Sequence, residues 1–332
     1  MTGLTRLSRT RIATWALALA VCAPALAQQS VASYPSRPVI LVVPFTAGSG
    51  SDIIARIITP RLSERWKQAV VVENRPGASG NLGADRVAKA APDGLTLLMA
   101  INTFTMTPPL YKTLPYDPIA DFAPVARLAV ANYALVVNSE VAARDVRSLV
   151  ALAKGLPAGQ LNYASPGNGT PHHLGMELMK SSLGIHVVHV PYKGIAGALT
   201  DVVGGQVQMM FATVHSVLPQ VRSGKLRMLA VTGAQRSALA PDIPTFREQG
   251  VTALEGLDAW YGAMAPARTP PDLLARLQRD FVEVLESDDI RKQLLGQGLF
   301  VQTSSSAELR DQIRADLVRW SKVVADAHIQ PE

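Results

Sequence analysis

The feature that most constrains the fold is a repeated order of apolar strand, glycine-containing turn and amphipathic helix. It first appears in residues 38–56, PVILVVPFTAGSGSDIIAR, where a Val- and Ile-rich run ends at Pro44 and a turn with Gly48 and Gly50 leads into a helix. Similar turns follow later, with the sequences NRPGASG (74–80) and SPGNGTPHH (165–173). Alternating β-branched runs and amphipathic stretches are typical of layered α/β folds. We therefore predict an α/β protein.

Two segments of the chain carry this pattern, and a helical tail follows them from residue 270. In the first segment we expect strands at 39–43, 70–72 and 95–101 and helices at 52–66 and 81–90. In the second we expect strands at 133–137, 161–164, 187–190, 207–211 and 226–232. Its helices are expected at 146–154, after the turn 165–173 as far as residue 183, and at 195–203. The tail is expected to end in a long helix near 307–325. Because ligands bind at the carboxyl ends of strands in open α/β sheets, two lobes of this kind would enclose a cleft. The crossings between them are expected near 126–133 and 257–266.

Residues 1–27 have the features of an export signal. Arg6, Arg9 and Arg11 precede an apolar core at 12–21 that is too short to span a bilayer comfortably, and residues 25–27 form the small-x-small pattern of a cleavage site. We predict cleavage after Ala27 and an exported protein, with an uncleaved anchor as the alternative. Lipid attachment at Cys22 is disfavoured because a Val precedes it.

Composition narrows the class of ligand. Cys22 is the one cysteine and leaves with the signal, so the mature chain is expected to lack disulfides and to depend on its core. Removing the three signal arginines lowers the formal net charge from +6 to +3. This mildly basic balance fits an acidic ligand. The chain has no run of Lys and Arg and no basic-aromatic interleaving, so we do not expect nucleic-acid binding.

The first turn is a candidate anion site. At the start of a helix, unpaired N–H groups and the positive end of the helix dipole attract an anion without a lysine. Ser49, Gly50, Ser51 and Asp52 occupy this position. Asp52 is equally well explained as a helix N-cap, and its charge would repel an anion. We therefore expect the backbone of the turn to bind, and the Asp52 side chain to cap.

The other two turns offer similar chemistry. Gly77 and Gly80 permit a close approach of backbone to ligand. Arg75 could pair with a ligand carboxylate, but an ion pair with Glu73 or Asp85 is favoured. In the third turn, Thr170 is expected to cap a helix that has proline at its first position.

Catalytic and metal-binding patterns are weak. His173 and Glu177 have i, i+4 spacing, but no further ligand follows at a recognised spacing, so no metal site is expected. His189 lies in an apolar strand, which favours a buried or cleft-edge histidine. Motifs of the types GxSxG, GxxxxGK[ST] and GxGxxG are absent. We expect no catalytic residue and no cofactor; a secreted hydrolase or lyase with a non-standard His/Asp site is the alternative.

Six segments in order carry a resemblance to a known family. They are YPSRPVILVVPFTAGSGSDIIAR, VVENRPGASGNLGADRVAKAAPDGLTLLMA, LYKTLPYDPIADFAPVARLA, LNYASPGNGTPHHLGMELMK, HVPYKGIAGALTDVVGGQVQMMF and GKLRMLAVTGAQRSALAPDIPTFREQG. The chain resembles the solute receptors of tripartite tricarboxylate transporters, the Bug or TctC-like family of periplasmic binding proteins. The resemblance covers nearly all of the mature chain.

The resemblance implies a two-lobed periplasmic-binding-protein fold of type II, the Venus flytrap, with a central ligand cleft. It implies that residues 34–130 and 259–332 form one lobe and 131–258 an inserted second lobe. The implied function is capture of a small organic carboxylate and its delivery to the subunits of a membrane transporter, by a monomer without catalysis. A ligand sensor for a signalling receptor uses the same cleft and is the alternative.

The resemblance also implies ligand-binding positions. In the first lobe they are Phe45, Ala47, Gly48, Ser49, Gly50, Ser51, Asp52, Arg75, Gly77, Ala78, Gly80, Asn102 and Thr103. In the second lobe they are Ser165, Gly167, Gly169, Thr170, His173, Lys193 and Asp201. The chain departs from the family at Ser49, which replaces one glycine of a double glycine, and at Asn102, where Ser or Ala is common. Both changes are expected to affect ligand choice, most of all Ser49.

Overall fold

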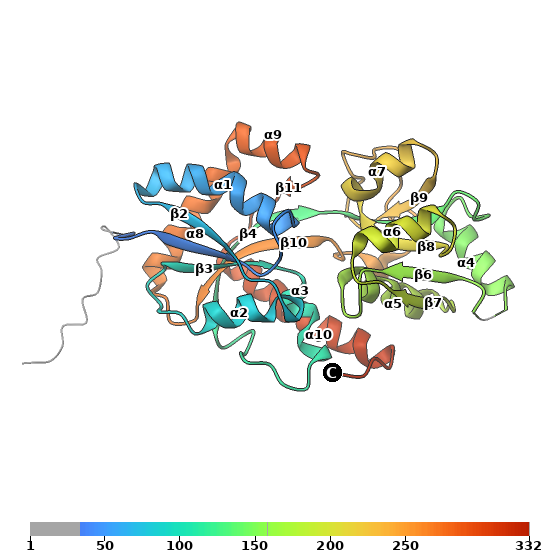
Figure 1. Ribbon diagram of the computed structural model, residues 1–332, viewed down its shortest axis with the longest axis horizontal. Coiled ribbons are helices and arrows are strands. Elements are labelled where there is room, and N and C mark those ends of the chain that lie inside the picture. Colours follow the sequence, from blue (N-terminus) through green and yellow to red (C-terminus); the bar gives the residue numbers. More distant parts are fainter. Residues whose placement is uncertain (1–33, 158, 332) are drawn as a thin grey trace, which may run out of the picture. The chain divides into compact units, whose positions relative to one another are not determined.

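The protein forms two β-sheets with helices packed against them, as the computed structural model shows (Figure 1). The structure describes residues 34–157 and 159–331. The predicted export signal, its cleavage site and Cys22 lie outside these residues. Two sheets with helices against them confirm the predicted α/β class. Among the described residues, no helix is both long and apolar enough to cross a membrane.

The first sheet has the strand order β11-β4-β10-β3-β1-β2. Its strands are β1 (Val39–Val43), β2 (Val70–Asn74), β3 (Thr96–Ile101), β4 (Phe122–Ala131), β10 (Ala259–Pro266) and β11 (Phe300–Val301). Strand β1 is parallel to β2 and β3, whereas β10 is antiparallel to β3 and β4. The first three strands therefore end at one edge of the sheet. They lead into α1 (Gly50–Trp66), α2 (Asn81–Ala88) and α3 (Thr103–Met106).

Helices cover both faces of the first sheet. On one face, α2, α3 and α10 (Ser306–Asp326) share a buried apolar cluster with the strands (Figure 1). Members of this cluster include Val42, Ala84, Leu98, Phe104, Trp260, Leu309 and Ile313. Helix α1 packs with α8 (Pro271–Glu286), where the rings of Trp66 and Phe281 meet edge to face at 6.1 Å. Helix α9 (Asp288–Gly296) follows α8.

The second sheet has the strand order β7-β6-β8-β5-β9. Its strands are β5 (Tyr133–Asn138), β6 (Asn162–Ser165), β7 (Val188–Pro191), β8 (Met209–Thr213) and β9 (Leu226–Val231). Its helices are α4 (Val146–Gly155), α5 (Pro171–Leu183), α6 (Ile195–Val203) and α7 (Val214–Arg222). Strand β6 is parallel to β7 and β8, and β5 is antiparallel to β8 and β9. The ends of β6 and β7 thus lead into α5 and α6 at one edge.

The chain passes between the sheets twice. Strand β4 belongs to the first sheet and β5 to the second, and Asn132 alone separates them. After β9, a segment with the short helix η4 (Thr252–Leu254) leads into β10 of the first sheet. Two further short helices are η2 (Ala78–Gly80) and η3 (Pro108–Leu110). The lobe boundaries stay a prediction.

Candidate functional site

The predicted site residues lie mostly in turns after β1, β2, β3 and β6. Two of these turns touch directly, because Asn74 at the end of β2 donates from Nδ2 to the carbonyl of Phe45 (3.0 Å) and to Asp52 Oδ1 (2.9 Å). Gly80 adjoins the ring of Phe45, and an added Cβ would lie 3.2 Å from it. The first two turns therefore form one continuous surface at the sheet edge.

The start of α1 differs from the prediction. The helix begins at Gly50, and its N-cap is Ser49, whose hydroxyl accepts from the N–H of Asp52 at 3.4 Å. The expectation that Asp52 caps the helix was wrong. The error arose because the helix starts two residues earlier than its apolar periodicity indicates. Ser49 therefore has a structural role as well as its predicted influence on the ligand.

Asp52 instead holds the first turn closed. Its carboxylate accepts from the N–H of Gly48, from Arg56 Nε and from Asn74 Nδ2, each at 2.9 Å. Burial alone would raise the pKa of Asp52, but the hydrogen bonds from Arg56, Gly48 and Asn74 hold it below its usual value. The N–H of Gly48 is thus engaged inside the turn. The N–H groups of Gly50 and Ser51 have no intrahelical partner, since they open the helix.

The second turn has an unusual backbone. Gly77, Ala78, Ser79 and Gly80 have φ angles of 132°, 46°, 56° and 98°, all positive. Two of these are non-glycine residues, for which this region is strained, and such strain is typical of functional sites. The side chain of Arg75 is exposed and pairs through Nε with Glu73, as the ion-pair interpretation predicted. The Arg75 side chain is thus engaged in an ion pair with Glu73.

The remaining first-sheet positions differ in exposure. Ala47 is exposed, whereas Asn102 and Thr103 after β3 are buried. Asn102 stands at the N-cap position of α3, but its side chain makes no capping hydrogen bond.

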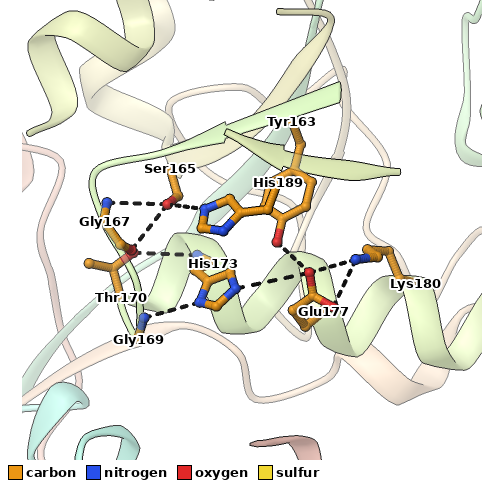
Figure 2. Close-up of polar contacts among 9 residues, drawn as sticks. All are labelled: Tyr163, Ser165, Gly167, Gly169, Thr170, His173, Glu177, Lys180 and His189. Atoms are coloured by element: carbon orange, nitrogen blue, oxygen red, sulfur yellow. Dashed lines mark hydrogen bonds and ion pairs between the residues drawn. The ribbon is translucent and has the colours of Figure 1, made fainter. Parts of the chain in front are cut away.

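A network of polar side chains contacts the turn after β6 (Figure 2). Thr170 accepts from the N–H of His173 at 3.4 Å and caps α5, with Pro171 at the first position, as predicted. Ser165 is fully buried, and its hydroxyl lies 2.6 Å from His189 Nε2. The N–H of Gly169 donates to His173 Nδ1 at 3.0 Å. Both histidines therefore bind the turn that carries the predicted ligand positions.

The two imidazoles also stack on each other. Their centroids are 4.1 Å apart and their planes lie at 11°. Burial lowers the pKa of His173 to about 4, and Lys180 adds to this; burial also lowers the pKa of His189 to about 4, and His173 adds to that. Both rings are thus neutral at neutral pH, and the tautomer of His173 that accepts from Gly169 carries its proton on Nε2.

Glu177 anchors the far end of this network. It accepts from the hydroxyl of Tyr163, and Lys180 Nζ approaches its two oxygens at 2.6 and 2.9 Å (Figure 2). Its Oε1 lies 4.0 Å from His173 Nε2. Among the described residues, no group of three or more His, Cys, Asp and Glu side chains is arranged to hold a metal ion. The i, i+4 pair of His173 and Glu177 therefore belongs to a structural network.

The last two predicted positions lie by the turn after β7. Lys193 is exposed, and Asp201 on α6 is half-buried and accepts from the hydroxyl of Tyr192 at 2.6 Å. Burial raises the pKa of Tyr192 to about 12, with Asp201 contributing. Tyr192 thus holds the Asp201 carboxylate.

Comparison with known proteins decides the family. The model of the tripartite tricarboxylate transporter family receptors, TctC, matches residues 54–329. The UPF0065 protein of the tcbD-tcbE intergenic region of Pseudomonas sp. (strain P51) is 34% identical over 311 residues, which are 93% of this chain and 92% of that protein. The chain belongs to this family of solute receptors.

Solved structures agree with this assignment. The structure of R. palustris Rpa4515 with adipate has a TM-score of 0.77 and 34% identity to the receptor, over 90% of this chain and 100% of that one. MatC from Rhodopseudomonas palustris with bound malate has a TM-score of 0.73 and 31% identity, over 88% and 100% of the two chains. The receptor thus has the periplasmic-binding-protein fold, and its family consists of solute-binding receptors of the periplasm.

Sequence reasoning missed three residues that shape this region. Asn74 joins two turns, and its place as a polar residue ending a Val-rich strand could have indicated this. His172 lies beside Tyr133, with the ring centroids 5.2 Å apart. Tyr261 lies against Gly50, where an added Cβ would be 2.9 Å from its Cζ. No sequence signal placed Tyr261, because β10 was not expected as a strand.

Proposed function

We propose that the receptor captures a small organic carboxylate in a cleft between two lobes and delivers it to a tripartite membrane transporter. The observation that carries the proposal is the start of α1. There the N–H groups of Gly50 and Ser51 have no intrahelical partner, and the Asp52 carboxylate is engaged with Gly48, Arg56 and Asn74. We place the ligand carboxylate against the N–H groups of Gly50 and Ser51.

The turn after β2 would complete the first half of the clamp, and the turn after β6 the second. Adipate and malate, the ligands of two similar receptors, are both dicarboxylates, which supports the class of ligand. Helix-terminus interactions contribute ~0.3–2 kcal/mol each. Several of them support micromolar binding, for which about −8 kcal/mol is needed. Because the described anion site offers neutral N–H groups and not a buried cation, an empty site leaves no unpaired charge there, and the ligand can be released easily.

Closure of the cleft follows from contacts on both sides. A ligand that touches residues 34–130 and 259–332 on one side and 131–258 on the other binds the closed form more tightly, and so shifts the population toward it. We take these ranges as the two lobes.

A thermal-shift panel tests the ligand class. The receptor, starting at Gln28, is unfolded, dialysed and refolded to remove co-purified ligand. It is then heated with mono-, di- and tricarboxylates, and with methyl esters of the same skeletons as neutral controls. We expect the acids to raise the melting temperature and the esters to leave it unchanged, because a ligand bound only by the folded state stabilises it. Failure of every acid, or equal effects of acid and ester, would contradict the proposal.

The same proposal includes three further statements: the receptor does not catalyse a reaction, it is exported to the periplasm, and it is a monomer. Incubation of the receptor with a bound acid should return that acid unchanged by NMR. Intact mass of the periplasmic protein should correspond to cleavage after Ala27. Light scattering should give the mass of one chain. Turnover abolished by His173→Ala would instead favour a hydrolase or lyase.

A further inference from the structure

The amide of Asn102 is buried, and its hydrogen-bonding groups are incompletely satisfied. Its residue is 2% exposed, and within the described part of the chain neither Oδ1 nor Nδ2 makes a hydrogen bond of ordinary geometry. A buried polar group whose hydrogen bonds are not made destabilises the folded protein. Such groups call for an explanation, and a bound ligand or water is the usual one.

Asn102 lies next to the proposed anion site. It directly follows Ile101, which pairs with Tyr261 across β3 and β10. Tyr261 in turn touches Gly50 at the start of α1, where an added Cβ would be 2.9 Å from the tyrosine Cζ. The amide is thus one residue away from the strand pair that supports the anion-binding end of α1.

Two tyrosines, Tyr261 and Tyr133, lie near the Asn102 amide. Burial raises the pKa of Tyr261 to about 12. Burial also raises the pKa of Tyr133, the first residue of β5, well above its usual value; Tyr261 adds to this, and hydrogen bonding between the Tyr133 phenol and the Asn102 side chain acts against it. Asn102 and both phenols are therefore close together, and the phenols are neutral. Because β3 and β10 lie in the first sheet and β5 in the second, the group contains residues of both.

The chemistry of the amide defines what can satisfy it. Nδ2 donates and Oδ1 accepts. A carboxylate only accepts, so it would satisfy Nδ2 and leave Oδ1 unpaired beside a negative charge. A hydroxyl both donates and accepts, and can therefore pair with both atoms of the amide.

We propose that Asn102 is a specificity-determining residue, which selects acids that carry a neutral donor-acceptor substituent, such as a hydroxyl, over the same acid without it. The assignment rests on the proposed function, because it places the substituent beside a carboxylate bound at α1. A carboxamide has the same donor-acceptor chemistry, and the test separates it from a hydroxyl.

Calorimetric titration of the ligand-free receptor tests this assignment. The probes are succinate, malate and succinamate, and glutarate, 2-hydroxyglutarate and glutaramate, so that each plain diacid has a hydroxyl and an amide counterpart. We expect at least one substituted acid to bind about ten- to a hundredfold more tightly than its plain counterpart. In Asn102→Leu, which has a similar shape but no polar atoms, this ratio should fall to about one. The same variant should have a higher melting temperature without ligand, because an unsatisfied buried group is removed.

Thr105→Val is the matched control. Thr105 is fully buried beside Asn102, but its hydroxyl is satisfied, since it donates to the Asn102 carbonyl at 2.9 Å. This variant should lose stability and keep the affinity ratio. A wild-type receptor without preference, or a preference that survives Asn102→Leu, would overturn the assignment while the carboxylate receptor stands. Binding of no acid at all would overturn both proposals.

Discussion

Asn132 donates a hydrogen bond from Nδ2 to Asp258 Oδ1 at 3.1 Å, and thereby joins the two segments that connect the sheets. Asn132 separates β4 from β5, and Asp258 directly precedes β10. Thr232 extends the link, because its hydroxyl donates to the same carboxylate oxygen and accepts from the N–H of Tyr133 at 3.0 Å. Both crossings are therefore fixed at one half-buried carboxylate.

Replacing this carboxylate should weaken the crossings. Asp258→Ala leaves Asn132 and Thr232 without an acceptor, and we expect the free energy of unfolding to fall by about 1–3 kcal/mol. Asp258→Asn should lose less, because its Oδ1 can still accept from both groups. Urea denaturation measures the two values. Equal losses in the two variants would show that the charge, and not the acceptor, stabilises the link.

The stacked histidines should make stability depend on pH. An imidazole whose pKa falls from 6.5 in the unfolded chain to about 4 in the folded protein, as in His173, binds protons mainly when unfolded within that range. Its contribution is complete above pH 6.5 and is lost as the pH falls toward 4. Between pH 7 and pH 4 the free energy of unfolding of the parent falls in part because His173 binds a proton on unfolding. We expect His173→Gln to make this fall smaller by about 1–3 kcal/mol.

The measurement is the difference between the unfolding curves of variant and parent at each pH. A difference is needed because burial raises the pKa of Asp316 to about 6, which favours the folded state as the pH falls. The exposed His186 supplies the control, and His186→Gln should follow the parent curve. A His173→Gln curve parallel to the parent at all pH values would contradict the prediction.

A glycine inside α2 is required by close packing. An added Cβ at Gly83 would lie 2.8 Å from the Cα of Pro44 and 3.1 Å from the carbonyl oxygen of Arg75, both of them backbone atoms. We expect Gly83→Ala to lower the free energy of unfolding by about 1–3 kcal/mol, as overpacking does, although alanine favours helices. Gly155 in α4 has open space around it, so Gly155→Ala should raise stability by up to about 1 kcal/mol. Chemical denaturation measures the free energy of unfolding of both variants. If Gly83→Ala left it unchanged, close packing would not require a glycine at this position.

Asp52 should be needed for the shape of the first turn. Asp52→Asn puts an N–H₂ group where two donors now converge on the carboxylate, so we expect a loss of about 1–3 kcal/mol in the free energy of unfolding. Acid binding should weaken at the same time. Asp326 forms an exposed i, i+4 pair with Lys322, and Asp326→Asn should change little. Thermal unfolding of Asp52→Asn and Asp326→Asn is measured with and without ligand. Equal melting temperatures of the two variants would mean that the Asp52 contacts do not stabilise the protein.

Local sequence patterns predicted much of this fold. Strand β1 was predicted at its observed bounds because its Val and Ile run is bounded by proline on both sides, and Thr170 and Pro171 gave the start of α5. Strands β4 and β10 were not predicted. Their side chains are buried through most of their length, so β10 shows no polar alternation, and both pair with strands distant in the sequence.

The sequence by itself determined the strand-turn-helix units, the glycines in their turns and the family resemblance, because these depend on residues close together in the chain. Only the tertiary structure decided how the polar side chains of those turns are used. Ser49 caps α1, Asp52 and Asn74 lock two turns together, and His189 reaches Ser165 from a neighbouring strand. The physical reason is that these hydrogen bonds join groups that packing brings together. The groups can be far apart in the sequence, so local sequence patterns do not predict the contact.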